Sequence, residues 1–247
     1  MAHVEVHRED IALEAPTLVE GLPGVGLVGK IAADHLVEVY DMVHYASAHC
    51  EGLPEIGVYA EGDPQIRSPV RFYADEENDL VVLQSDAPVS PSGAKEFASC
   101  IVGWFESIDA TPVFLSGMAV ERGENAVPSV YGVATGEGAS ILEAAGVDAP
   151  TVDGAITGPT GALIHQANIV GMTSVGLVVE ADRRFPDPAA ARQLLADGIG
   201  PIAGVEIETA VLVDQAEQIR NAKARLAEQL QNADEESTSA RPLGMYQ

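Results

Sequence analysis

Apolar residues occur along the chain in short runs that alternate with stretches of helical periodicity. The clearest run is 173–181 (TSVGLVVEA), which is nearly all apolar, as expected for a strand covered on both faces. The turn-like segment ADEEND separates two further runs, 66–73 and 80–84, and predicts a hairpin. The remaining predicted strands cover residues 17–20, 43–49, 56–60, 112–119, 129–134 and 151–156.

Helices are predicted where apolar residues recur every three or four positions. The predicted helices cover residues 27–39, 93–108, 138–145, 160–170, 188–199 and 206–232. Ser90 or Ser92 is expected to cap the second helix, and Gly146 to end the third. The long helix 206–232 carries a narrow apolar line that Lys223 interrupts. This line can pack on the sheet or join a partner subunit.

The alternation of strands and helices predicts an α/β protein, a three-layer α/β/α sandwich with a mixed sheet. Residues 1–232 contain no linker and are expected to form one domain. Residues 233–247 form a polar, acidic segment that cannot bury enough apolar surface to order itself, so we expect a flexible tail. It ends in Met245, Tyr246 and Gln247, a hydrophobic-tyrosine-any tripeptide that is either arbitrary or a ligand for a partner's pocket.

The charge balance limits the classes of binding partner and indicates the salt concentration in which the protein works. The chain has 247 residues, 47% of them apolar, with 38 acidic and 13 basic side chains and a net charge of −25. Self-repulsion on this scale destabilises a compact state at low salt and is screened at molar salt, where the Debye length is about 3 Å. We therefore expect a halophilic cytosol. The negative field argues against nucleic acid and anionic membranes as partners.

The cysteines and histidines indicate neither a disulfide nor a metal site. Cys50 and Cys100 each lie in an apolar context, where buried free thiols are expected. The histidines show no metal-ligand spacing. No signal peptide or transmembrane helix is apparent, so a reducing cytoplasm is the expected compartment.

Two glycine-rich turns are the candidates for ligand binding. Gly24, Gly26 and Gly29 form a G-x-G-x-x-G frame between a strand and a helix, as in dinucleotide sites, but tight packing explains the same glycines. Gly158 and Gly161 precede a second helix, whose N-terminus can hold an anion or simply form a connecting loop.

Other polar residues form no catalytic constellation. Ser85 and Ser116 follow strands without an assignable histidine or acid partner. His165 and Asn168 share a helix and can face a cleft, although such histidines are commonly structural. We expect no catalytic residue, no cofactor and no metal. The alternative is a small-ligand or nucleotide-binding enzyme that uses the glycine-rich turns.

Several segments resemble the archaeal branch of the proteasome assembly chaperone family. They are EGLPGVGLVGKIAADHL, YGVATGEGASILEAAGV, DGAITGPTGALIHQANIVGMTSVGLVVEA and the closing Met-Tyr-Gln. The resemblance covers most of residues 15–232 and the tail. It implies an α/β/α domain related to nucleoside phosphorylase-like folds, a homo-oligomer and no established enzymatic activity.

The resemblance also gives the closing tripeptide a role. Some archaeal relatives dock on the α ring of the 20S proteasome through a C-terminal hydrophobic-tyrosine-any tripeptide. Met245 matches the hydrophobic position, Tyr246 the tyrosine and Gln247 the last residue. The resemblance therefore implies an oligomeric chaperone or adaptor whose partners are the 20S α subunits and further copies of itself.

Overall fold

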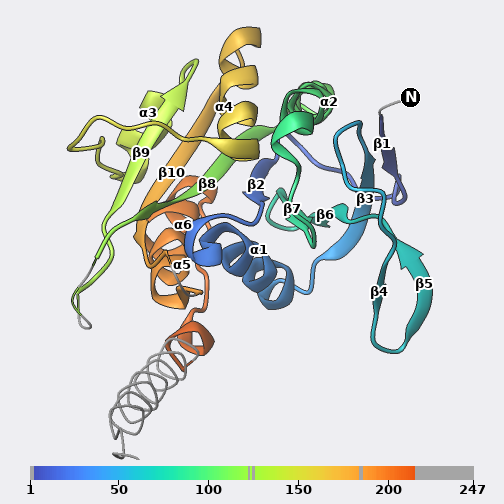
Figure 1. Cartoon of the computed structure of the whole chain (residues 1–247), viewed down its shortest axis with the longest axis horizontal. Helices are drawn as coiled ribbons and strands as arrows, with labels where there is room; N and C mark the ends of the chain where they lie inside the picture. Colours follow the sequence, from blue (N-terminus) through green and yellow to red (C-terminus); the bar gives the residue numbers. More distant parts are fainter. Residues whose placement is uncertain (1–2, 122, 124–125, 184–185, 215–247) are drawn as a thin grey trace, which may run out of the picture.

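The computed structural model describes residues 3–121, 123, 126–183 and 186–214. An eight-stranded mixed sheet, in the order β1-β3-β6-β7-β2-β8-β10-β9, forms the centre of the fold (Figure 1). Its strands are β1 (His3–Val6), β2 (Thr17–Gly21), β3 (Val43–His49), β6 (Val70–Asp75), β7 (Leu80–Ser85), β8 (Thr111–Ala119), β9 (Val130–Thr135) and β10 (Ser174–Ala181). The central strands β7, β2, β8 and β10 pair in parallel, and the outer strands pair antiparallel.

Helices cover both faces of this sheet and confirm the predicted three-layer architecture (Figure 1). One apolar cluster lies between the sheet and α1 (Val28–Val39), α3 (Gly138–Ala145), α5 (Pro188–Leu194) and α6 (Gly200–Ala203). A second lies on the opposite face, beneath α2 (Ala94–Ser107) and α4 (Gly158–Val170). Each central strand is buried on both sides, which explains its continuous apolar run.

Most predicted elements are confirmed, with small shifts at their ends. The helices predicted at 27–39, 93–108, 138–145 and 160–170 are α1, α2, α3 and α4. The side chain of Ser90 accepts a hydrogen bond from the Gly93 amide in the short 3-10 turn η2 (Pro91–Gly93) that precedes α2, so Ser90 is the cap. Gly146 ends α3 with a φ of 70°, in the left-handed region that glycine favours.

Three predicted segments differ from the structure. The run 66–73 is two strands, β5 (Asp63–Arg67) and β6, because Ser68 and Pro69 interrupt it; β5 pairs instead with β4 (Val58–Ala60) in a separate hairpin. The predicted strand 151–156 is irregular, since these residues pair with no sheet edge and Val152 is 63% exposed. The helix predicted at 188–199 comprises α5 and a following π-helical turn, Leu195–Ile199 (η3).

Two further predictions concern the chain's ends. The structure adds an edge strand, β1, that the sequence pattern did not predict. Of the predicted helix 206–232, residues 210–214 are helical in the structure, and residues 215–232 lie outside the described part, as does the tail 233–247. The two interpretations of that helix therefore stay predictions.

The prediction of two free cysteines is wrong. Cys50, directly after β3, and Cys100, in the middle of α2, form a disulfide with a Cα–Cα distance of 5.9 Å. The two residues are 50 positions apart in the sequence, so only the packing of α2 against β3 brings them together. Within the described residues, no helix is both long enough and apolar enough to span a membrane.

Candidate functional site

The parallel strands β2, β7, β8 and β10 end at one edge of the sheet, where α/β proteins usually place their sites. The G-x-G-x-x-G turn follows β2 at this edge and leads through the 3-10 turn η1 (Val25–Leu27) into α1. The candidate residues from the sequence are therefore described first at this carboxyl edge.

Glu20 is the most unusual residue at the carboxyl edge, since its side chain is completely buried. Its Oε1 atom accepts hydrogen bonds from the Leu22 amide (3.2 Å) and the Thr160 hydroxyl (3.0 Å). Its Oε2 atom accepts one from the Leu115 amide at 3.0 Å. Pairing between β2 and β8 ends one residue before Leu115, so the carboxylate replaces the backbone acceptor that β2 no longer supplies.

Burial raises the pKa of Glu20 to about 7, and the hydrogen bonds from Leu115, Thr160 and Leu22 oppose this shift. Thr160 lies in the first turn of α4, so Glu20 connects β2, β8 and α4. Both carboxylate oxygens are already hydrogen-bonded within the protein. This arrangement fixes α4 against the centre of the sheet.

The glycines of the first turn pack against neighbouring strands. A Cβ at Gly26, whose φ is +64°, would lie 3.0 Å from Cβ of Ala181, and one at Gly29 would lie 3.1 Å from the Leu22 carbonyl oxygen. Only Gly24 has open space beside it among these three. A dinucleotide fingerprint needs the backbone of its second glycine open to the pyrophosphate. Here that glycine faces Ala181, so the geometry favours the packing interpretation.

The second glycine-rich turn is partly open. Gly158 has a φ of +70° and no neighbouring atom within 4 Å of a Cβ position, whereas Gly161 lies directly against the backbone of Ile156. His165 and Asn168 are both exposed on α4. The structure thus brings Thr160, and neither of these two residues, to Glu20.

A charged network that the sequence analysis missed lies beside α1. Lys30 Nζ is 2.9 Å from the Asp34 carboxylate and 3.6 Å from that of Asp86. Arg71, only 5% exposed, donates to Asp86 Oδ2 at 2.6 Å and to Gln84 Oε1 at 3.1 Å. The alternation of apolar and polar residues in β6 was the available signal. The network joins α1 to β6 and β7 and satisfies a nearly buried guanidinium.

Of the two serine candidates, Ser85 has a local structural partner. The buried Ser85 hydroxyl donates to the Ala87 carbonyl at 2.6 Å. Ser116 lies in β8, which pairs with β10, and its side chain is half-buried. Across the described portion of the chain, no group of three or more histidine, cysteine or acidic side chains is placed to hold a metal ion.

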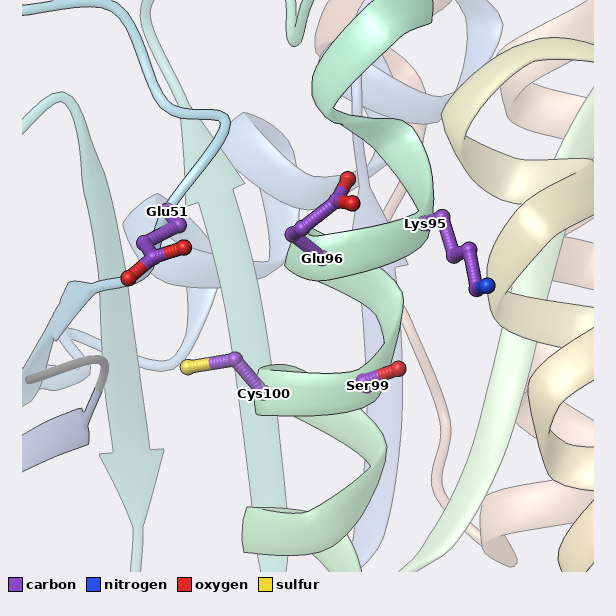
Figure 2. A pocket seen from close by; sticks show the side chains of 5 residues that line it. All are labelled: Glu51, Lys95, Glu96, Ser99 and Cys100. Carbon is purple, nitrogen blue, oxygen red and sulfur yellow. The ribbon is translucent and has the colours of Figure 1, made fainter.

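A surface pocket of about 390 Å³ lies beside the disulfide (Figure 2). Glu51, Lys95, Glu96, Ser99 and Cys100 line it. It is formed by the loop after β3 and the first half of α2, and no residue of the glycine-rich turns lines it. The residues predicted to bind a partner, Met245, Tyr246 and Gln247, lie outside the described residues.

Comparisons with known proteins identify relatives over nearly the whole chain. The model of the PAC2 family matches residues 18–227. An uncharacterized protein of Methanocaldococcus jannaschii is 28% identical over 226 residues, which are 91% of this chain and 90% of that protein.

Solved structures share the fold. The chain matches Pyrococcus furiosus PbaA, described as an archaeal homologue of proteasome-assembly chaperone, with a TM-score of 0.77 and 28% identity over 95% of this chain and 100% of PbaA. It matches P. furiosus PbaB, described as an archaeal proteasome activator, with the same TM-score of 0.77 and 24% identity over 92% of this chain and 98% of PbaB.

Proposed function

The chain belongs to the PAC2 family, and from this premise we propose that it is an oligomeric proteasome-assembly chaperone or adaptor that docks on the 20S α ring through its C-terminal tail. The observation that carries the proposal is the full-length match to PbaA, at 28% identity and a TM-score of 0.77. The match to PbaB supports the shared fold.

The carboxyl edge supports a binding role over catalysis. The glycine that would approach a pyrophosphate, Gly26, lies against protein atoms, and the oxygens of Glu20 are occupied by three donors. The alternative function is a small-ligand or nucleotide-binding enzyme, and its remaining support is the open space beside Gly24 and Gly158. A thermal-shift screen with nucleotides and phosphate tests it, and stabilisation by any of them would favour the enzyme.

The side chains and the terminal carboxylate of the tail are chemically suited to bind in a pocket between ring subunits. Tyr246 would fill an apolar slot with its hydroxyl hydrogen-bonded, Met245 would add adaptable contact, and the carboxylate of Gln247 would pair with a lysine. Burial of the two larger side chains contributes about 1.5–3 kcal/mol each, against the entropy of association. One tail therefore binds weakly, and an oligomer that presents several tails gains about 10² to 10⁴ in affinity.

Other properties follow from the same proposal. A proteasome partner places the chain in the cytoplasm, an assignment that no longer rests on free cysteines because Cys50 and Cys100 are joined. Residues 1–232 would form one domain and residues 233–247 a spacer that reaches roughly 20 Å on average. The net charge of −25 supports a high-salt cytosol.

Deletion of residues 245–247 tests the docking mechanism. The truncated protein should fail to retain the 20S proteasome in a pull-down at molar KCl, while light scattering should give the same oligomer mass as for the full chain. Equal retention of the proteasome by both proteins would refute tail docking. A change in oligomer mass would show instead that these residues hold the subunits together.

A further inference from the structure

The disulfide links the base of a projecting hairpin to helix α2. After Cys50 the chain runs through residues 51–57 into β4, and β4 and β5 form a two-stranded sheet apart from the main one (Figure 1). The hairpin exposes apolar side chains, with Tyr59 78% and Ile66 67% accessible. Its orientation relative to the sheet therefore depends on how the two connecting segments are held.

The incoming segment is held at three points. Cys50 is bonded to Cys100, and Gly52, with a φ of +91°, crosses the backbone of Gly93 so closely that a Cβ would lie 2.7 Å from the Gly93 Cα atom. Leu53 packs on the apolar cluster beneath α2. The outgoing segment has a separate attachment, because the Ser68 hydroxyl donates to the Ala48 carbonyl at 2.8 Å. The disulfide therefore attaches the incoming segment, and not the outgoing one, covalently to α2.

The two cysteines differ in exposure. Cys50 is 7% exposed, whereas Cys100 is partly exposed and lines the surface pocket. Exposed disulfides are the ones that thiols reduce readily, and the accessible sulfur is the one attacked. The chain contains only these two cysteines, so reoxidation within one chain can form only the original disulfide.

The pocket presents negative charge to an incoming thiol. Figure 2 shows Glu51, on the loop, on the side of α2 toward which the Cys100 sulfur projects, and Glu96 one turn before Cys100, with its carboxylate turned upward in the view. Lys95 points to the other flank of the helix in the same view. A thiol attacks as its thiolate, so one whose body carries a further negative charge is repelled by these carboxylates more strongly than one whose body is uncharged or cationic.

We propose that Cys50–Cys100 is a site of reversible thiol–disulfide exchange, entered at Cys100 by a small uncharged or cationic thiol, and that reduction releases the base of the β4–β5 hairpin from α2. A thiolate attacks Cys100 Sγ and forms a mixed disulfide, and Cys50 leaves as a thiolate that takes a proton from water. A second thiol attacks the mixed disulfide, so two thiols are oxidised to one small disulfide and both cysteines are reduced. The inference does not depend on tail docking.

Reduction rates test the entry route. The rate of disulfide reduction would be measured with cysteamine (cationic), 2-mercaptoethanol (uncharged) and 2-mercaptoethanesulfonate (anionic), at the lowest KCl concentration at which the protein is folded. Each rate would be divided by the rate at which the same thiol reduces 2-hydroxyethyl disulfide, which corrects for the intrinsic reactivity of the thiol. We expect the cationic thiol to exceed the anionic one by about three- to tenfold, and the Glu51→Gln/Glu96→Gln variant to lose most of this difference. The exposed Glu106→Gln, farther along α2, is the matched control and should keep it.

Hydrogen exchange tests the structural consequence. On reduction of the wild-type protein, amides of residues 51–67 should exchange about tenfold faster or more, amides of β2 and β8 should not change, and reoxidation should restore the original rates. The Cys50→Ser/Cys100→Ser variant should show the reduced pattern without any thiol. The proposal is overturned if the disulfide reacts only on global unfolding, if thiol charge has no effect, or if residues 51–67 keep their protection after reduction.

Discussion

Replacement of Glu20 by glutamine is expected to remove a pH dependence of stability between about pH 4.5 and 7. The pKa of this glutamate rises from its ordinary value of 4.5 to about 7 on folding, chiefly because the side chain is completely buried. In that interval the folded state binds the proton more tightly than the unfolded chain does. The free energy of unfolding contributed by Glu20 therefore falls as pH rises through the interval, and is fully retained below it.

The magnitude follows from the width of this interval. A shift from 4.5 to about 7 corresponds to about 3 kcal/mol lost between the acid side and pH 8. Glutamine is uncharged and imitates the protonated acid. Its amide nitrogen cannot accept from the Leu22 and Leu115 amides, so one of these bonds is lost, at a cost of about 1–3 kcal/mol at every pH.

The assay is urea unfolding at fixed high KCl from pH 4.5 to 8, with wild type, Glu20→Gln and the exposed Glu106→Gln as a control for the loss of one negative charge. From pH 4.5 to pH 8, the unfolding free energy of the wild type should fall by about 3 kcal/mol relative to that of Glu20→Gln. The control should follow wild type. Parallel pH profiles for wild type and Glu20→Gln would refute the assignment of a proton to the buried carboxyl group.

Three further predictions concern stability. Gly21→Ala should lower the free energy of unfolding by about 3 kcal/mol in chemical unfolding, because the new Cβ would collide with Cβ of Ala33. The control Gly103→Ala lies in open space on α2 and should raise it by about 0.5–1 kcal/mol. Equal effects of the two substitutions would contradict the packing of β2 on α1. Asp86→Asn should lower stability by about 2 kcal/mol, discounted for the partial exposure of Asp86, since Arg71 loses its counter-ion; an unchanged melting temperature would argue against the network. The melting temperature of the wild type should rise from low to molar KCl as repulsion among its net −25 charge is screened, and a flat profile would exclude the halophilic interpretation.

The strands and helices that were predicted well are those in which burial alone determines the pattern. The run 43–49 coincides with β3, and 173–181 differs from β10 by one residue, because both are covered on at least one face. The edge strand β1 alternates exposed and half-buried residues, and its partner β3 lies about 40 residues away. The segment 151–156 forms no strand because it pairs with no sheet edge, and its Asp153 and Gly154 are residues that strands disfavour.

The candidate site was less predictable because it depends on contacts distant in sequence. The disulfide joins residues 50 positions apart, and Glu20 meets Thr160 across 140 positions. A charged residue within the apolar run of β2 was a visible signal for Glu20, since a buried carboxylate needs donors. The role expected for the tail came only from its resemblance to a family, because a polar, acidic sequence has no apolar pattern that would indicate its partner.

The binding isotherm of the 20S proteasome for the Tyr246→Ala variant tests tail docking most directly. Tyr246→Phe is the matched variant, since it keeps the ring and removes only the hydroxyl. At molar KCl, Tyr246→Ala should lose binding at least a hundredfold as each weakened tail compounds across the oligomer, and Tyr246→Phe should lose far less. An isotherm for Tyr246→Ala that superimposes on that of the wild type, with the same oligomer mass, would contradict the account.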